Sequence, residues 1–195
     1  VFLSALRASR YDVALVQEHK IPESARRTKI KEAFHLGFIA VLSCNSSGKA
    51  KGGTGIFIRI TPDLTTPEDI ESEHSLHDMN GGFTKASFTW EGERVEVASM
   101  YAPDKADNRK AFLDKLASRQ RSANPPIAQD TILGGDFNTV PDVRVDLTFP
   151  RMDPSDLRAK RAQYDNKHSD TLEDLLTTAG LEDILRSRVG PRTRV

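Results

Sequence analysis

The chain has 195 residues, which is enough for one domain with a sizeable core and short for two, and its 37% apolar content excludes wholesale disorder. Lysine plus arginine and aspartate plus glutamate number 28 each, so the overall positive charge of many nucleic-acid-binding domains is absent, although a local basic face could still serve. The single cysteine, Cys44, excludes an internal disulfide and favours a reducing, intracellular compartment, and no apolar run approaches membrane-spanning length.

Apolar, β-branched runs and turn residues alternate along the first half of the chain. The elements expected there are a helix at 2–7, a strand at 11–18, a basic helix opening at Pro22, strands at 37–43 and 55–60, and a hairpin of strands 83–90 and 94–100 closed by Glu91-Gly92-Glu93. Residues 61–82 are acidic and rich in turn residues, which predicts a mobile insertion between two of the strands.

The second half is expected to contain two helices and one further strand. Residues 107–118 have amphipathic helical spacing, and a second helix should begin at the N-cap Ser169 and stop at Gly180. Between them, the apolar run Thr131-Ile132-Leu133 ends in two glycines and predicts a buried strand. Interleaved strands, hairpins and helices predict an α/β fold, a layered sandwich and not a strict parallel βαβ chain.

Two polar side chains stand where expected strands end. Glu18 follows a strand and precedes a basic loop, which suits a ligand for Mg²⁺, a cation that takes one or two carboxylates. A solvated glutamate is the alternative. Tyr101 follows a strand and precedes Ala102-Pro103, so its phenol has a fixed direction and can donate to a phosphate oxygen. A tyrosine that caps the core is the alternative.

A carboxylate and an amide follow the strand predicted at 131–133. Asp136 and Asn138 alternate along its end, so we expect them to share a face while Phe137 points into the core. The aspartate can accept a proton from water, and the asparagine can orient it and donate to a phosphate oxygen. A structural turn with an Asx hydrogen bond is the alternative. With Glu18 and Tyr101, the pair predicts a metal-dependent phosphodiesterase.

Four segments, taken in order, resemble the endonuclease/exonuclease/phosphatase superfamily: Gln17-Glu18, Gly52-Gly53-Thr54-Gly55-Ile56, Met100-Tyr101-Ala102-Pro103 and Gly134-Gly135-Asp136-Phe137-Asn138. The resemblance covers nearly the whole chain and implies one domain over 1–195 with a DNase I-like, four-layered fold, a two-layer β-sandwich flanked by helices. It implies phosphoester hydrolysis with Mg²⁺ or Mn²⁺, Glu18 binding the metal and Tyr101 contacting the scissile phosphate. Asp136 would activate or orient the water, and Asn138 would support Asp136 and the phosphate.

Within the superfamily the chain is most similar to endonuclease domains of non-LTR, LINE-like retrotransposons. The phrases that carry this likeness are Tyr101-Ala102-Pro103, Arg109 with Phe112, Gly135 to Val140, and Ala179 to Arg186. The likeness implies a DNA substrate that is nicked, a substrate contact by Arg109, a polyprotein with reverse transcriptase and action in the nucleus. Abasic-site repair nucleases usually continue with Val-Ala-His where this chain has Thr139-Val140-Pro141, which ranks the repair function lower.

Two parts of the superfamily pattern have no counterpart in this sequence: an N-terminal strand that carries an Asn, and a C-terminal Ser-Asp-His strand. His168-Ser169-Asp170 has the reverse order and is better explained as a helix start. We therefore expect an incomplete domain, truncated at both ends and inactive alone. The alternatives are a cellular superfamily member that acts on RNA or a small phosphoester, and a non-catalytic, degenerate remnant.

Two clusters of charged residues have less specific meanings. The basic residues of the helix after Pro22 could follow a DNA backbone, or they could form an ordinary solvated face; they are Arg26, Arg27, Lys29 and Lys31. His74 and His77 lie among acidic residues, and a solvated acidic loop explains them better than a second metal site does.

Overall fold

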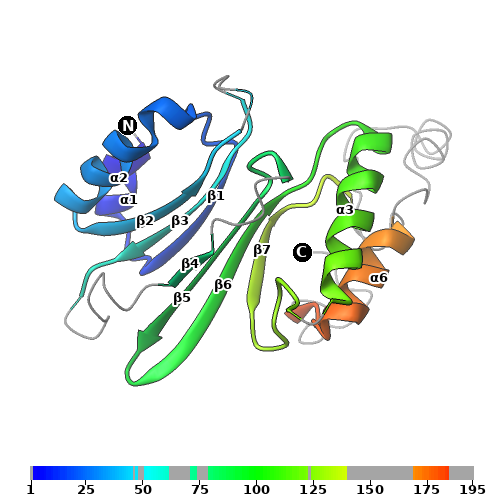
Figure 1. Ribbon diagram of the computed structural model, residues 1–195. Helices are drawn as coiled ribbons and strands as arrows, with labels where there is room; N and C mark the ends of the chain where they lie inside the picture. Colours follow the sequence, from blue (N-terminus) through cyan, green and yellow to red (C-terminus); the bar gives the residue numbers. More distant parts are fainter. Residues whose placement is uncertain are drawn as a thin grey trace, which may run out of the picture. The chain divides into compact units, whose positions relative to one another are not determined.

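The computed structural model describes residues 2–45, 47, 51–61, 71–73, 79–122, 124–139 and 169–184. In chain order the elements are α1 (Phe2–Ala8), β1 (Val13–Gln17), the short 3-10 helix η1 (Glu23–Ala25), α2 (Arg26–His35), β2 (Phe38–Ser43), β3 (Thr54–Arg59), β4 (Glu71–Glu73), β5 (Phe83–Trp90), β6 (Glu93–Tyr101), α3 (Ala106–Gln120), β7 (Ile132–Asp136) and α6 (Ser169–Ala179) (Figure 1).

The described residues belong to two compact units. The first contains the residues up to Ala102 together with Asp130–Asp136, and therefore holds every described strand with α1 and α2. The second contains α3 and α6. The expected helices and strands are thus largely found, and the prediction of an α/β fold with two sheets is confirmed. The assignment of residues 1–195 to a single domain stays a prediction.

Two sheets make up the first unit. One has the order β1-β3-β2 and is antiparallel throughout, and the other has the order β4-β5-β6-β7, with β6 and β7 parallel (Figure 1). A parallel neighbour cannot be reached by a tight hairpin, so the chain needs a long connection between β6 and β7, and this connection includes α3. β1 and β2 both run antiparallel to β3, so their carboxyl ends lie at the same end of their sheet.

An apolar layer fills the space between the two sheets. Its buried residues are Val41, Ile56, Ile58, Ala86, Phe88 and Val97, and Leu15 and Trp90 pack against them. These side chains come from β2, β3, β5 and β6 at alternate positions, as expected where one face of each strand is buried. The sandwich is therefore held mainly by removal of apolar surface from water.

The opposite face of the β1-β3-β2 sheet is covered by α1 and α2 (Figure 1). A second apolar cluster forms there from Leu6 of α1, Ala33 of α2 and strand residues, the fully buried Phe38 and Leu42 among them. Phe34 of α2 is 52% exposed, because the covered stripe of this helix passes through Ile30 and Ala33.

The predicted hairpin at 83–100 is confirmed. β5 and β6 pair from Phe83↔Met100 to Trp90↔Glu93, and the two linking residues Glu91 and Gly92 both have positive φ, at 49° and 84°. Two residues with positive φ give the turn whose twist matches a right-handed hairpin. The segment 61–82, predicted to be a mobile insertion, contains the strand β4, which pairs with β5, and the buried Met79.

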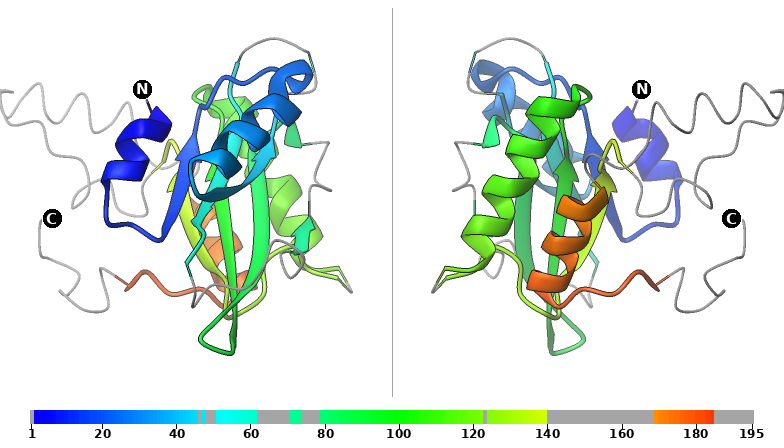
Figure 2. Two further views of the ribbon diagram at one scale, coloured as in Figure 1. Left: turned by 90° about the vertical axis from the view of Figure 1, so that its left-hand side faces the viewer. Right: turned by 90° about the vertical axis from the view of Figure 1, so that its right-hand side faces the viewer.

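The second unit packs α3 against α6 (Figure 2). Phe112, Leu113 and Leu116 of α3 and Leu172 and Leu175 of α6 are buried. Arg121 after α3 donates to a carboxylate oxygen of Asp174 on α6 at 2.7 Å.

The predicted stop of the last helix is found at Gly180, which has φ 65°. The Leu181 amide donates to the Leu176 carbonyl and the Gly180 amide to the Thr177 carbonyl, the pair of bonds that closes a Schellman motif. The expected N-cap side chain of Ser169 and the polar stretch 142–167 lie outside the described residues.

The strand predicted at 131–133 is only partly buried. β7 forms there and pairs with β6, but Ile132 is 54% exposed. In the described part of the chain β7 is the edge strand of its sheet, so its side chains are covered less than those of β6. The absence of a side chain at Gly134 lets β7 approach β1, because a Cβ atom there would lie 2.7 Å from the Leu15 Cδ1 atom.

Candidate active site

Three of the predicted site residues meet at one end of the sandwich. The Tyr101 hydroxyl, at the end of β6, donates to the Glu18 Oε1 atom, just beyond the end of β1, at 2.5 Å. Tyr101 is also the register partner of Asp136, the last residue of β7. The amide of Ala102 donates to the Asp136 carbonyl at 2.9 Å and continues the parallel ladder past the strand ends. Glu18, Tyr101 and Asp136 therefore belong to one polar surface built by both sheets.

A polar bridge between the sheets aligns these strand ends. The Gln17 side-chain amide donates to the Ser99 hydroxyl at 3.0 Å, and that hydroxyl donates to the Val16 carbonyl at 3.3 Å. Ser99 and Tyr101 stand two residues apart on β6 and share a face, so the bridge fixes the face from which Tyr101 reaches Glu18. No role was predicted from the sequence for Gln17 or Ser99, although the alternation Ser99-x-Tyr101 was a usable signal.

A second polar pair lies behind the bridge and is fully buried. The Thr54 and Thr84 hydroxyls are 2.6 Å apart, and the Thr54 hydroxyl also donates to the Gly81 carbonyl at 3.0 Å. Each buried hydroxyl thus has a partner, which removes the cost of burying it. The start of β3 is thereby tied to the start of β5 at the same end of the sandwich.

Glu18 has an unusual backbone for a non-glycine residue. Its φ is 51° and that of Lys20 is 55°, both in the left-handed region that L-residues enter at a cost. The Lys20 ammonium lies 3.7 Å from the second Glu18 oxygen, with the side chains 62% and 46% exposed. An ion pair this exposed stabilises little, so other contacts must hold the loop.

His19, between these two residues, is folded inward. Its Nδ1 atom accepts the Ile21 amide hydrogen at 3.0 Å, so the ring proton belongs on Nε2, which donates to the Ser43 carbonyl at 3.1 Å. Burial lowers the pKa of His19 below its ordinary value, and the hydrogen bond to Ser43 offsets this in part. One accepting and one donating ring nitrogen is the hydrogen-bond pattern of a neutral imidazole.

The donor chemistry of this surface fits a hard divalent cation. In the described ranges no three His, Cys, Asp or Glu side chains converge on one point. Magnesium does not need such a cage, because it keeps several waters and takes one or two carboxylates and phosphate oxygens. Glu18 offers an accessible carboxylate at a strand end, and Asp136, also exposed, offers another on β7. His74 and His77, which were predicted to belong to a solvated acidic loop and not to a metal site, lie outside the described residues.

Asn138 does not share a strand face with Asp136, so that prediction is wrong. β7 ends at Asp136, and Asn138 lies in a bend with φ 48°. The strict alternation of a strand stops where the extended backbone stops. Phe137, expected in the core, is only partly buried. The proposed support of Asp136 by Asn138 stays a prediction.

Arg109 lies in the second unit, in the first turn of α3. One guanidinium nitrogen donates to the Asp104 carbonyl at 2.7 Å and to the Pro103 carbonyl at 3.3 Å, so the side chain holds the turn that leads into the helix. A helix-start role of this kind is structural. Its contact with substrate stays a prediction.

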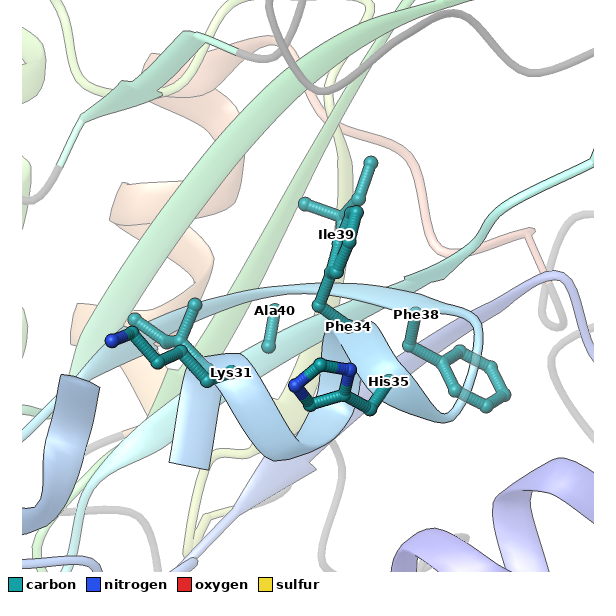
Figure 3. A pocket seen from close by; sticks show the side chains of 7 residues that line it. Lys31, Phe34, His35, Phe38, Ile39 and Ala40 are labelled. Atoms are coloured by element: carbon teal, nitrogen blue, oxygen red, sulfur yellow. The ribbon is translucent and has the colours of Figure 1, made fainter. Parts of the chain in front are cut away.

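A separate cavity of about 510 Å³ lies between α2 and β2 (Figure 3). Phe34, His35 and Lys31 of α2 line it together with Phe38 and Ile39 of β2 (Figure 3). Its lining contains no carboxylate, so it lacks the chemistry expected of a magnesium site. Glu18 lines a different cavity of about 480 Å³, whose apolar lining includes Phe2, Val16 and Phe57.

Comparisons with known proteins agree with this geometry. The model of the Endonuclease/Exonuclease/phosphatase family matches residues 2–185, and no curated protein matches the chain. A similar solved structure is the endonuclease domain of TRAS1, a telomere-specific non-LTR retrotransposon (16% identity, 93% of this chain, 65% of that chain, TM-score 0.56). Another is the AP endonuclease LMAP from Leishmania major (12% identity, 97% of this chain, 63% of that chain, TM-score 0.60).

These likenesses are structural, since both identities are low. They confirm the predicted DNase I-like class of fold. The chain spans less than two thirds of the length of either structure. None of the described helices combines the length and the apolar composition of a membrane-spanning segment.

Proposed function

The chain belongs to the endonuclease/exonuclease/phosphatase family, and on that premise we propose that it is a magnesium-dependent phosphodiesterase that nicks DNA as the endonuclease domain of a LINE-like retroelement. Encoding together with a reverse transcriptase and action in the nucleus are part of this proposal. Manganese is expected to replace magnesium, because both accept carboxylate, water and phosphate oxygens.

One observation carries the proposal: the hydrogen bond from Tyr101 to Glu18, beside Asp136. It joins the ends of strands from two different sheets, so three side chains of the expected chemistry lie on one surface. Here the hydroxyl is directed to a carboxylate that is 46% exposed.

Asp136, Tyr101 and Glu18 would each have a separate role in the proposed hydrolysis. The exposed Asp136 carboxylate would accept a proton from the attacking water, which makes that oxygen a better nucleophile. The Tyr101 hydroxyl is a donor that rotates about its C–O bond, so it can turn from Glu18 to a phosphate oxygen. Magnesium bound at Glu18 would stabilise the negative charge that develops on the phosphate.

The test is a plasmid-nicking assay on the full natural product that contains residues 1–195. Conversion of supercoiled to open-circular DNA should require Mg²⁺ or Mn²⁺ and should fall about a hundredfold or more in Asp136→Ala. A matched control is Asp114→Ala, which removes an exposed carboxylate of α3 that pairs with Lys110. Nicking that survives Asp136→Ala, or that falls equally in both variants, would contradict the proposal.

The same protein separates the remaining alternatives. Faster cleavage of RNA or of a small phosphodiester than of DNA would favour a cellular phosphoesterase, which the balanced charge of the chain permits. A DNA enzyme should bind DNA with an affinity that falls steeply with salt, because each phosphate contact releases counterions. Absence of cleavage on all three substrates would indicate a degenerate remnant.

A further inference from the structure

The loop after β1 presents Glu18 from a backbone that is unfavourable by itself. Glu18 and Lys20 both have φ in the left-handed region, and the residue between them is His19. Neither residue is glycine, so the conformation has to be imposed by neighbouring contacts. The direction of the Glu18 carboxylate depends on whatever imposes it.

The His19 ring makes contacts to three separate segments. It accepts the Ile21 amide hydrogen within the loop and donates to the Ser43 carbonyl at the end of β2. It also lies against Gly53, where a Cβ atom would stand only 2.3 Å from the ring Cε1 atom. Gly53 has φ 91°, so both its conformation and its missing side chain are required at this contact.

The backbone of the same loop is hydrogen-bonded to Gly52 and Gly53. The His19 amide donates to the Gly53 carbonyl at 3.4 Å and the Lys20 amide to the Gly52 carbonyl at 2.9 Å. These two bonds extend the β1–β3 ladder past its last pair, Gln17↔Thr54. The ring and the ladder together leave Glu18 little freedom of backbone rotation.

We propose that His19 is a positioning residue for the metal site, whose imidazole holds the loop so that the Glu18 carboxylate faces Tyr101 and Asp136. Both ring nitrogens are already engaged with backbone groups, so His19 acts through Glu18 and does not touch substrate. The inference rests on the proposed role of Glu18 as a metal ligand. Residues that orient metal ligands commonly change metal affinity tenfold or more when replaced.

Replacement of the ring by two residues of similar reach separates hydrogen bonding from packing. Asparagine keeps an acceptor one atom beyond Cγ, where the His19 Nδ1 atom is, so His19→Asn can still accept from Ile21. Leucine fills the space but accepts nothing. His35→Leu is the matched control, because His35 is an exposed histidine at the end of α2.

The measurement is the Kd for Mn²⁺ by calorimetry on the full natural product, with the fold of each variant checked by circular dichroism. We expect His19→Leu to raise this Kd about tenfold, His19→Asn to stay within about threefold of wild type, and His35→Leu to leave it unchanged. Equal Kd values in the Leu and Asn variants would overturn the proposal and leave His19 a packing residue.

Two further measurements keep the result decisive. Glu18→Gln should weaken Mn²⁺ binding most; if it does not, the assignment of the ligand is wrong, and the role of His19 fails with it. If Glu18→Gln weakens binding but His19→Leu does not, only the positioning role fails. Should His19→Leu not fold, amide exchange of wild type decides: Mn²⁺ should slow exchange at Lys20 and Ile21, and unchanged rates would reject the proposal.

Discussion

The core between the two sheets and the strand ends that form the candidate site are built from the same strands in different ways. In the core, Ile56 and Ile58 are fully buried and regular strand backbone places them at alternate positions. At the strand ends, Glu18 is accessible, adopts a left-handed φ and depends on hydrogen bonds across the sheets. The core therefore contributes most of the stability. At the strand ends the backbone is less regular, and polar side chains lie close together.

This contrast predicts that the largest loss of stability comes where the two regions meet. A Cβ atom at Gly135 on β7 would lie 1.9 Å from the Met100 carbonyl oxygen, so Gly135→Ala forces β7 away from β6. We expect the free energy of unfolding to fall by more than about 4 kcal/mol, measured by urea denaturation. Gly92→Ala is a control for side-chain addition, because nothing lies near a Cβ there; its positive φ of 84° makes it cost only about 1 kcal/mol.

Inside the core, a smaller but still large loss is expected. Phe88→Ala removes a ring that is 2% exposed and should lower the free energy of unfolding by about 3 kcal/mol through lost burial and a cavity. Phe34→Ala removes the same ring where it is 52% exposed and should cost less than about 1 kcal/mol. Comparable losses of unfolding free energy in the two variants would show that burial of Phe88 between the sheets contributes no more to stability than the exposed ring of Phe34.

The reactivity of Cys44, just after β2, shows whether residues at the strand ends are shielded from water as the core is. Burial, and next the negative charge of Glu23, raise the pKa of the thiol from 9.0 to about 11. Alkylation by iodoacetamide at pH 8 should be about a hundredfold slower in the folded protein than in urea, since two pKa units lower the thiolate fraction by that factor. Equal rates in the two states would show that water reaches this end of β2.

The sign of the linked stability effect follows from the same shift. The unfolded thiol loses its proton at lower pH than the folded one, so between pH 9 and about 11 the folded state binds more protons. The contribution of Cys44 to stability is therefore complete below pH 9 and declines as pH rises through this window. Cys44→Ala should flatten that part of the unfolding profile.

The smallest effect is expected at the site itself, and on function only. Tyr101→Phe keeps the ring and removes the hydroxyl that donates to Glu18. Nicking should slow about tenfold or more, while the free energy of unfolding changes by less than about 1 kcal/mol, because the hydrogen bond is exposed to water. Tyr11→Phe, at a ring that is 71% exposed, should change neither quantity. Equal loss of stability and activity in Tyr101→Phe would assign the tyrosine to structure.

Most of the local structure follows from the amino-acid sequence alone. The apolar, β-branched run at 55–60, the turn residues Glu91-Gly92 and the glycine at 180 predicted a strand, a hairpin and a helix stop, because these depend on backbone preferences of neighbouring residues. The motifs around Glu18, Tyr101 and Asp136 also indicated the family. The match of the family model to residues 2–185 confirms it.

The pairing of these elements and the position of each side chain depend on contacts between distant parts of the chain. Nothing local in Ile132 shows that its strand lies at a sheet edge, and nothing in Asn138 shows that the strand stops two residues earlier. In the sequence His19 is one residue of a basic loop, and only the fold shows that Gly53 and Ser43 contact its ring. Strand order, edge exposure and contacts across the sandwich join residues far apart in the chain, and periodicity within a segment carries no information about them.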